Sequence, residues 1–580
     1  VTAAPMLFGT LITMFGFVPI GFAKSGVGEY AGNIFWVLAF SLLISWLVAV
    51  TFAPYLGVLL LPSRAKNASH EHVYDASIYQ TLRALVTFCV RRRHLTIAGT
   101  VAILVLAFAG LAGPVEKQFF PGSDRPEAII TINLPAGTAI GDTNDVVKRI
   151  EQWISEQKDV SHFSAYIGAG APRFFISIVP EHPDSAFAKL IVVARDAHAR
   201  DRVIRELRTR IDAGEFPEAR IRVNALLFGP PVQWPVSFRV VGPDPQQLRN
   251  IATDVSRFMT QDPHIVAPIW EWNRRVPRLH LDIDNARLVR LGLTPADVSK
   301  QMQFRTDGIP VTSIRQDIRN VEVWARARDA SGTPPVYELL NNRGKKVPLS
   351  QVGPLEVRYE EALVRRINGE KFIDIMSDVT DAQPQDVTTA IWNTLAPLRA
   401  SLPPGYHLEI GGSYEQSVKA EASINQVFPL MLALMLMCIM LQMRSFSGTF
   451  VVLATAPLGV IGAVISLLIF RQSFGFVAML GLIGLGGILM RNTLILTQQV
   501  SDNLREGLPV EKAIIEAAVM RARPVGLTAL AAALAFIPLA SDSFWGPLAY
   551  VLIGGVIVGT VITLLFVPAL YAACFRGKGD

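Results

Sequence analysis

Arg491 places a full positive charge inside an apolar stretch that runs from about Phe474 to Val500. A helix crosses a bilayer core with about 20 mostly apolar residues, so this stretch is long enough to do so. A charged side chain in hydrocarbon costs roughly 2.5 kcal/mol or more, and it normally faces the protein interior and pairs with a carboxylate or a carbonyl. The alternative is that Arg491 snorkels to the surface, which lies roughly nine residues or roughly 13 Å away along the helix. We therefore expect a buried partner for Arg491.

Four glycines precede Arg491 in the same stretch, and their missing side chains let neighbouring helices approach closely. They are Gly481, Gly484, Gly486 and Gly487. This pattern predicts a central helix that is packed on several sides.

The composition indicates a multi-span membrane protein with additional parts outside the membrane, because 51% of the 580 residues are hydrophobic. The formal net charge of +6 does not require a nucleic-acid partner, since Lys and Arg at cytoplasmic helix ends account for it. Cys89, Cys438 and Cys574 lie in or beside apolar segments, so we expect inert packing residues and no disulfide framework. The sequence opens with Val1 at the edge of an apolar run, which suggests a fragment.

We expect eight membrane spans. They lie at about residues 4–22, 34–61, 95–113, 425–442, 449–470, 475–500, 524–540 and 547–574. None of these spans holds a buried Asp or Glu, so the counter-charge for Arg491 must come from outside this membrane part.

Basic residues set the predicted topology. The run Arg91–Arg93 places the start of the third span inside the cell, as do the basic residues of loop 501–523. The predicted organisation is a span pair at 1–62, a cytoplasmic amphipathic segment at 63–94, a span at 95–113, a periplasmic block at 114–420, five spans at 421–575 and a tail at 576–580. The amphipathic segment carries an apolar stripe suited to the membrane interface, formed by Tyr79, Leu82, Leu85, Val86 and Cys89.

The block at 114–420 alternates between period-2 and period-3.6 patterns in an order close to a split βαβ unit. In its first half we expect strands at 127–135, 160–168, 173–181, 186–194 and 221–228, and helices at 143–157 and 201–214. A second, similar round begins at 235–243 and is interrupted by an insert at about 277–358. The block shows no catalytic triad, metal-ligand spacing or phosphate loop, so the sequence does not point to an enzyme.

Several longer stretches then match a known family. They are FGFVPIGF, TFAPYLGVLLLPSR, FFPGSDRPEAIITINLPAGT, ATAPLGVIGAVISLLIF, RNTLILTQQV, RARPVGLTAL and FVPALYAACFRG. With them the whole chain resembles the resistance-nodulation-division permeases, specifically their hydrophobe/amphiphile efflux branch. Such a permease has twelve spans, and this chain resembles the part from the fifth span onward. The implied fold is an α-helical polytopic membrane protein with an α+β periplasmic region, made of ferredoxin-like porter modules and a docking insert.

The resemblance also implies a function and a set of partners. The implied activity is proton-driven export of amphiphilic small molecules by a secondary transporter, with no cofactor. The implied assembly is a homotrimer in the inner membrane of a Gram-negative cell, which docks onto a periplasmic adaptor and an outer-membrane channel. Its surroundings would be the lipid bilayer, and no nucleic acid is expected.

The family's proton relay pairs two aspartates on the fourth span with a basic residue on the tenth. By resemblance the basic position is Arg491, followed by Asn492, while Arg521 and Thr528 occupy the other two relay positions. Arg491 replaces the commoner Lys, and an arginine stays protonated, so it acts as a fixed charge. For Thr528 the alternative is a hydroxyl bonded back to its own helix.

By resemblance, Phe163 and Phe175, with neighbours Phe174 and Arg173, would line an apolar substrate pocket. The alternative is that these phenylalanines are core residues of strands. Two other functions stay open: a secretion-accessory protein or inactive half-permease with the same fold, and heavy-metal efflux. The latter is less favoured because the block's three methionines are widely spaced, at Met259, Met302 and Met376.

Overall fold

The computed structural model describes residues 3–60, 77–118, 120, 122–229, 232–272, 274–327 and 338–575. The predicted tail at 576–580 and residues 63–76 of the predicted cytoplasmic segment lie outside the described residues. The chain divides into two compact units. One unit comprises Val1–Glu271 and Arg365–Asp580, and the other is Trp272–Val364.

Within the described residues, seven helical segments are long and apolar enough to cross a membrane. They are α3 (Gly26–Leu60), α5 (Arg93–Ala112), α13 (Gly412–Met443), α14 and α15 (Phe446–Leu453 and Gly459–Ile469, joined by the short helix η3, Ala456–Leu458), α16 (Phe476–Arg505), α17 (Val510–Ala540) and α18 (Gly546–Phe575). The first predicted span is divided into α1 (Ala3–Gly16) and α2 (Val18–Gly21), which meet at Phe17, and Pro19 lies in the first turn of α2. Proline is tolerated in the first turn of a helix, where its missing N–H is not needed.

Three helices extend beyond the predicted spans, because hydropathy marks the apolar part of a helix and not its full length. α13 begins at Gly412 instead of about 425, and α16 continues to Arg505. α17 begins at Val510 instead of about 524, so most of the predicted loop 501–523 is helical. Glu511 lies in the first turn of α17, where a carboxylate is favourable at the positive end of the helix dipole.

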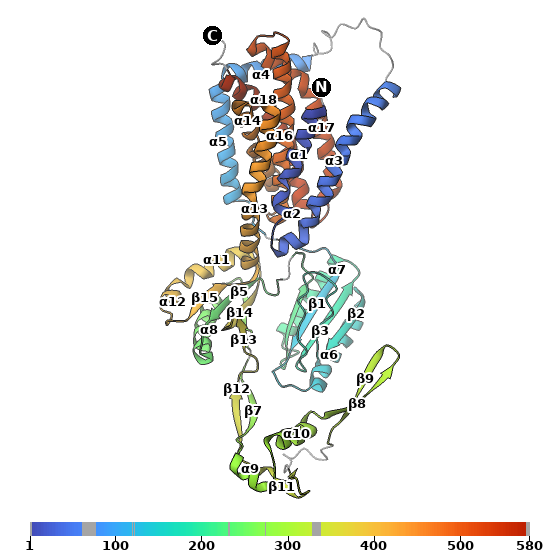
Figure 1. Cartoon of the computed structure of the whole chain (residues 1–580), viewed down its shortest axis with the longest axis vertical. Coiled ribbons are helices and arrows are strands. Elements are labelled where there is room, and N and C mark those ends of the chain that lie inside the picture. The colour runs from blue at the N-terminus through green and yellow to red at the C-terminus, as the bar shows by residue number, and fades with distance from the viewer. Residues whose placement is uncertain are drawn as a thin grey trace. The chain divides into compact units, whose positions relative to one another are not determined.

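α16 is the central helix of this part and packs against α1, α17 and α18 (Figure 1). Its glycines allow the close approach that the sequence predicted. An added Cβ at Gly481 would lie 3.0 Å from Val551 of α18, and one at Gly487 would lie 2.9 Å from Thr13 of α1. Gly484 faces Phe17 in the same way, at 2.7 Å. The prediction is therefore confirmed for these three glycines, whereas Gly486 has only ordinary contacts.

Helix α4 (Ser77–Arg91) packs against α17 and α18. The apolar stripe that the sequence suited to a membrane interface packs in part on the helix bundle: Val86 and Cys89 are buried, and Leu82 packs against a core formed with α17 and α18. The side chain of Leu85 stays 46% exposed. Burial against neighbouring helices satisfies the same apolar pattern as a membrane surface, so the sequence alone could not distinguish them.

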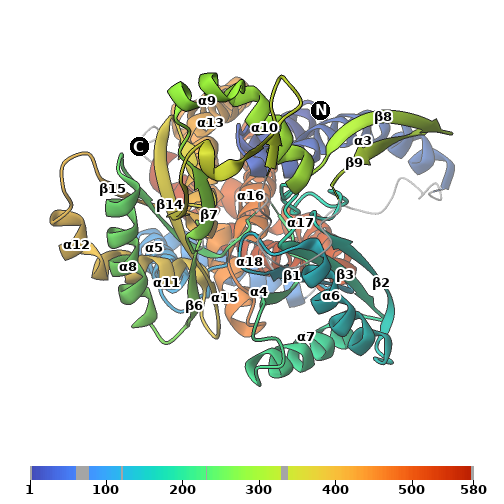
Figure 2. The ribbon, with the colours of Figure 1, turned by 90° about the horizontal axis from the view of Figure 1, so that it is seen from below.

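The first α/β module is a four-stranded antiparallel sheet with two helices. Its elements in chain order are β1 (Glu127–Asn133), α6 (Ile140–Ser155), β2 (Val160–Ile167), β3 (Phe187–Ala194), α7 (Ala197–Asp212) and β4 (Arg220–Ala225). The strand order in the sheet is β2-β3-β1-β4. Helices α6 and α7 share one core with the sheet and lie on one face of it (Figure 2). Ile130 of β1 and Ile150 of α6 are fully buried in this core.

The second module repeats this strand order. Its elements are β5 (Val236–Val241), α8 (Pro245–Thr260), β6 (Ile265–Trp270), β13 (Arg365–Ile367), β14 (Glu370–Val379), α11 (Pro384–Thr394), α12 (Ala396–Ala400) and β15 (His407–Ile410). β14 pairs with β6 and β5, and β5 pairs with β15, which corresponds to the order of the first sheet. The Trp272–Val364 unit leaves this module between β6 and β13, and the predicted insert at 277–358 lies within it.

The unit Trp272–Val364 is built from short strands and helices. It contains β7 (Val276–Leu281), α9 (Asn285–Leu291), α10 (Pro295–Thr306), β8 (Ile309–Gln316), β9 (Arg319–Ala325), β10 (Glu338–Leu340), β11 (Lys346–Pro348), the short helix η2 (Leu349–Gln351) and β12 (Leu355–Glu360). The strands form three antiparallel pairs, β7 with β12, β8 with β9 and β10 with β11. Thr294 and Asp297 form a capping box that starts α10.

Residues 173–181 do not form the strand that the sequence predicted. They belong to an irregular segment between β2 and β3, which covers the face of the first sheet opposite to α6 and α7. Ile178 is buried there together with Ile129 and Ile191 of the sheet. Glu181 forms an ion pair with Lys189 of β3, whose side chain is 7% exposed. Apolar burial and one ion pair thus hold this segment without strand pairing.

Candidate functional site

Arg491 lies in the second half of α16, directly opposite a glycine of α1. An added Cβ at Gly9 would lie 2.5 Å from Cγ and 3.0 Å from Cδ of Arg491. The apolar stem of the arginine therefore rests on the backbone of α1, and only a glycine leaves room for it. Within the part of the chain that the structure describes, the guanidinium has no hydrogen-bond or ion-pair partner.

The residues that follow Arg491 are buried and polar. Asn492 is 7% exposed and Thr493 is 1% exposed. The hydroxyl of Thr493 lies 3.1 Å from the hydroxyl of Thr455, which in turn donates to the Val452 carbonyl oxygen at 2.7 Å. Each polar side chain in an apolar bundle needs such a partner. These bonds connect α16 with the break between α14 and α15.

The structure does not bring Arg521 or Thr528 into contact with Arg491. Arg521 donates from Nε to Oε1 of Gln499 at 3.0 Å, which links α17 to α16 about two turns beyond Arg491. Thr528 donates from Oγ1 to the carbonyl oxygens of Pro524 and Val525, at 3.1 and 2.8 Å. Its hydroxyl is bonded to its own helix, as the alternative for this residue anticipated.

The four residues predicted to line a substrate pocket divide into two groups. Phe163 of β2 packs against the core of the first module, and Phe175 packs against the buried cluster on the opposite face of the sheet. The Arg125 guanidinium lies 4.9 Å from the centre of the Phe175 ring, a cation–π contact. Phe174 is 47% exposed, and Arg173 is exposed with its Nη2 bonded to the Ile176 carbonyl oxygen at 3.0 Å. Phe174 and Arg173 are therefore the two that present side chains to solvent.

A pocket of about 420 Å³ lies where α5 ends and α16 begins. Its apolar lining includes Phe108 and Leu111 of α5 and Phe476 and Met479 of α16. Its charged lining consists of Lys117 and Glu421.

Backbone pairing between distant segments builds this pocket. The amide of Phe474 donates to the Glu116 carbonyl oxygen at 2.7 Å, and the amide of Gln118 donates to the Phe474 carbonyl oxygen at 3.1 Å. Gln385 of α11 and Ser417 of α13 are bonded to each other and also line the pocket. This pocket could not be predicted from the sequence, because its residues come from five separate segments and no local motif marks where they meet.

Comparison with known proteins identifies the family. The sequence model of the AcrB/AcrD/AcrF family matches residues 2–574. The chain belongs to this family. The AcrB/AcrD/AcrF proteins are resistance-nodulation-division efflux permeases, which are secondary transporters and not enzymes. Pumps of this kind form trimers and work with adaptor and outer-membrane channel partners.

The chain aligns with individual members of the family over nearly its whole length. It is 26% identical to the cobalt-zinc-cadmium resistance protein CzcA of Cupriavidus metallidurans, covering 99% of this chain and 56% of that protein. It is 23% identical to the multidrug resistance protein MdtC of Proteus mirabilis, covering 96% of this chain and 54% of that protein. The chain thus spans about half the length of the curated relatives it matches.

A solved structure agrees in fold. The crystal structure of a heavy metal efflux pump superposes with a TM-score of 0.76 at 21% identity, over 98% of this chain and 57% of that one. The predicted hydrophobe/amphiphile branch is not confirmed by the relatives, since the metal-resistance protein CzcA matches at higher identity than MdtC.

Proposed function

We propose that this chain contributes the part from the fifth span onward of a proton-driven efflux permease in the inner membrane of a Gram-negative cell. Family membership and the seven membrane-length helices support this proposal. The α/β modules would then be periplasmic porter modules of ferredoxin-like topology, and the Trp272–Val364 unit would contain the docking insert for an outer-membrane channel. The working assembly would be a homotrimer with a periplasmic adaptor.

In this proposal Arg491 is the fixed charge of the proton relay. Its stem is held on Gly9, and its guanidinium has no partner among the described residues. Intramembrane charges need a counter-charge, so the proposed partners are carboxylates elsewhere in the complete transporter. Protonation of those carboxylates would release Arg491 and shift the packing of α16 against α1. Asn492, the residue after Arg491, would also take part in the proton relay.

The geometry changes the proposed roles of the other relay residues. Arg521 is bonded to Gln499, so it would fix α17 against α16 rather than meet Arg491 directly. Thr528 is bonded within its own helix and would need to break those bonds to act in a relay.

The proposed cargo class is amphiphilic small molecules, and the pocket at the ends of α5 and α16 is the feature that supports it. Its volume of about 420 Å³ falls in the range of about 300 to 1,000 Å³ typical of small-molecule sites. Aromatic and aliphatic side chains would bury the apolar part of a ligand, while Lys117 and Glu421 offer one charge of each sign. A molecule with an apolar body and a polar end fits that lining.

A second candidate is export of divalent metal ions. The observation that favours it is that metal-resistance proteins match at 25% to 26% identity, against 23% for MdtC. The two cargo classes make different demands, because metal ions need several converging donor atoms and an amphiphile needs apolar area.

One experiment tests transport and cargo together. The complete transporter, with its adaptor and channel, is expressed in a cell that lacks its own exporters, and growth is measured against amphiphiles and against cobalt, zinc and cadmium salts. We expect resistance to amphiphiles that Arg491→Ala abolishes at unchanged protein level. Resistance to metal salts alone favours export of divalent metal ions. Resistance to neither class favours a secretion-accessory protein or an inactive half-permease. Retained resistance in Arg491→Ala contradicts the relay role.

A further inference from the structure

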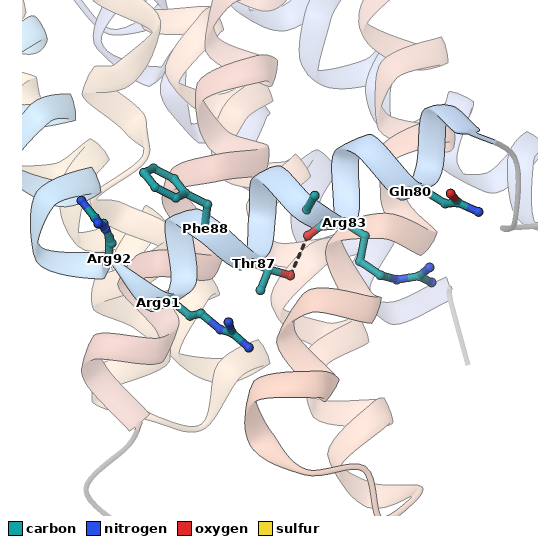
Figure 3. A pocket seen from close by; sticks show the side chains of 7 residues that line it. Gln80, Arg83, Thr87, Phe88, Arg91 and Arg92 are labelled. Carbon is teal, nitrogen blue, oxygen red and sulfur yellow. Dashed lines mark hydrogen bonds between the residues drawn. The ribbon is translucent and has the colours of Figure 1, made fainter.

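Helix α4 has one face that the bundle does not cover. Six residues of this helix, together with Arg92 directly after it, line an open groove of about 600 Å³ (Figure 3). They are Gln80, Arg83, Ala84, Thr87, Phe88, Arg91 and Arg92. Their spacing of three and four residues along α4 means that the groove follows one side of the helix.

The three arginines of the groove are held differently. Arg83 forms a bidentate pair with Glu516 of α17, with both bonds at 2.9 Å, so its charge is compensated. Arg91 lies 3.5 Å from Glu511, and the two side chains are 74% and 51% exposed. An exposed pair of this kind is weak, because solvent screens both charges, so Arg91 can exchange Glu511 for another anion.

Arg92 is the cation of the groove without a carboxylate neighbour among the residues that the structure describes. Its guanidinium carbon lies 5.5 Å from the centre of the Phe88 ring, and that ring is 52% exposed. Arg92 therefore offers positive charge beside an exposed aromatic surface, and Arg91 adds a second positive charge to the lining of the same groove.

The groove opens at the start of a membrane-length helix. Arg92 is the N-cap of α5, and α5 begins at Arg93. The first turns of α5 expose Leu95 (62%) and Val101 (48%). An apolar helix surface thus starts within one turn of the two arginines, which is how a membrane boundary is arranged: charge at the headgroup level and apolar side chains below it.

We propose that this groove binds the headgroup of an anionic phospholipid. Arg91 and Arg92 bind the phosphate, the Phe88 ring covers the glycerol region, and the acyl chains lie along the exposed side of α5. Two features on the groove favour this occupant over a protein segment: the uncompensated positive charge and the direct continuation into an apolar membrane helix. An anionic lipid is preferred over a zwitterionic one, because the latter carries its own cation next to the phosphate. The site does not depend on which cargo is exported.

Native mass spectrometry of the detergent-solubilised full-length protein tests the proposal, with phosphatidylglycerol and phosphatidylcholine added separately. We expect the wild type to prefer phosphatidylglycerol. In R91Q/R92Q the affinity for this lipid should fall about 25-fold, since each basic residue near a surface contributes about 1 kcal/mol or about five-fold. The affinity for phosphatidylcholine should change little.

Three controls make the result specific. R505Q/R523Q removes the same charge from exposed arginines of α16 and α17 and should leave the preference intact. R91K/R92K keeps the charge and should keep most of the preference. If R91Q/R92Q is not recovered as a monodisperse protein, R92Q alone is measured, with about a five-fold loss expected.

The proposal is overturned if R91Q/R92Q keeps the wild-type preference, or if R505Q/R523Q loses as much as R91Q/R92Q. Displacement of the lipid by inorganic phosphate at concentrations that leave phosphatidylcholine bound also overturns it, because the groove would then be a simple anion site.

Discussion

Arg222 of β4 and Asp378 of β14 form a bidentate ion pair that joins the two α/β modules. Nε and Nη2 of the arginine lie 2.7 and 2.5 Å from the two carboxylate oxygens. The side chains are 17% and 29% exposed, and the guanidinium carbon also lies 3.8 Å from the centre of the Trp234 ring. Charge-assisted pairs with this geometry are the strong ones, and partial burial reduces screening by solvent.

Asp378→Asn should loosen the contact between the modules. Removing one partner of a charged hydrogen-bonded pair costs about 1.5 to 3 kcal/mol, so amide exchange in β4 and at the end of β14 should accelerate by about ten-fold or more. Hydrogen–deuterium exchange of the purified protein measures this. Asp159→Asn is a matched control, because Asp159 pairs with Arg202 at 2.8 and 2.9 Å within the first module. Equal acceleration in both variants would contradict an inter-module role.

Gly9→Leu should abolish transport without removing any charge. The substituted side chain would occupy the space of the Arg491 stem, whose Cγ lies 2.5 Å from an added Cβ. Growth of cells that carry the complete transporter, under its cargo, measures the effect. Gly99→Leu on α5 is the control, since an added Cβ there has no neighbour within 4 Å among the described residues. Normal transport in Gly9→Leu would show that the position of Arg491 is not critical.

The stability of the second module should depend on pH through Glu271. Burial is the main cause that raises the pKa of this carboxyl from 4.5 to about 7, although Arg365, at 2.9 Å, opposes the shift. The folded state therefore binds more protons than the unfolded state between pH 4.5 and 7, so stability should fall as the pH rises through this window. The change is roughly 3 kcal/mol at most.

Glu271→Gln should remove that dependence, because the amide stays neutral at every pH. Hydrogen exchange of β13 and β14 at several pH values, corrected for the intrinsic exchange rate, measures the change. Glu370→Gln, an exposed carboxyl at the start of β14, should behave like the wild type. A slope that persists in Glu271→Gln would assign the pH dependence to another group.

Phe174→Ala and Phe175→Ala should separate a binding role from a packing role. Phe174 is 47% exposed, so its truncation should alter export of large apolar cargo at unchanged stability. Phe175 packs in a buried cluster and under Arg125, so its truncation should destabilise the first module by about 1 to 3 kcal/mol. Export assays combined with thermal unfolding measure both effects. Loss of stability in Phe174→Ala would contradict this division.

The elements with strong periodicity could be predicted from the sequence. β1 and α6 were expected at 127–135 and 143–157 and are found at Glu127–Asn133 and Ile140–Ser155. The strand predicted at 173–181 was wrong. This segment buries its alternating apolar residues by packing on a face of the sheet, and such packing gives the same sequence pattern as a strand that pairs within the sheet.

The residues of the candidate site could be predicted only where the sequence of a single helix contains the pattern that marks them. The glycines of α16 and the charge of Arg491 are local features, and the structure places Gly487 and Arg491 against α1 and Gly481 against α18. The contact of Arg521 with Gln499 depends on how two helices are rotated about their axes. The pocket at the ends of α5 and α16 depends on backbone pairing between Glu116 and Phe474, which are more than 300 residues apart in the sequence. Neither has a local signature.

α13 runs without interruption from Gly412 beside the second module to Met443 at the far end of its apolar part. At 1.5 Å per residue its 32 residues measure roughly 48 Å. Near its start Glu415 is 3.4 Å from Arg239 of β5, and Ser413 is bonded to the backbone before that strand. A rod of this length that pivots by roughly 5° at one end moves its other end by roughly 4 Å, which exceeds the reach of a hydrogen bond. Because α13 is continuous, a small tilt of its apolar part would be enough to break polar contacts at the base of the second sheet.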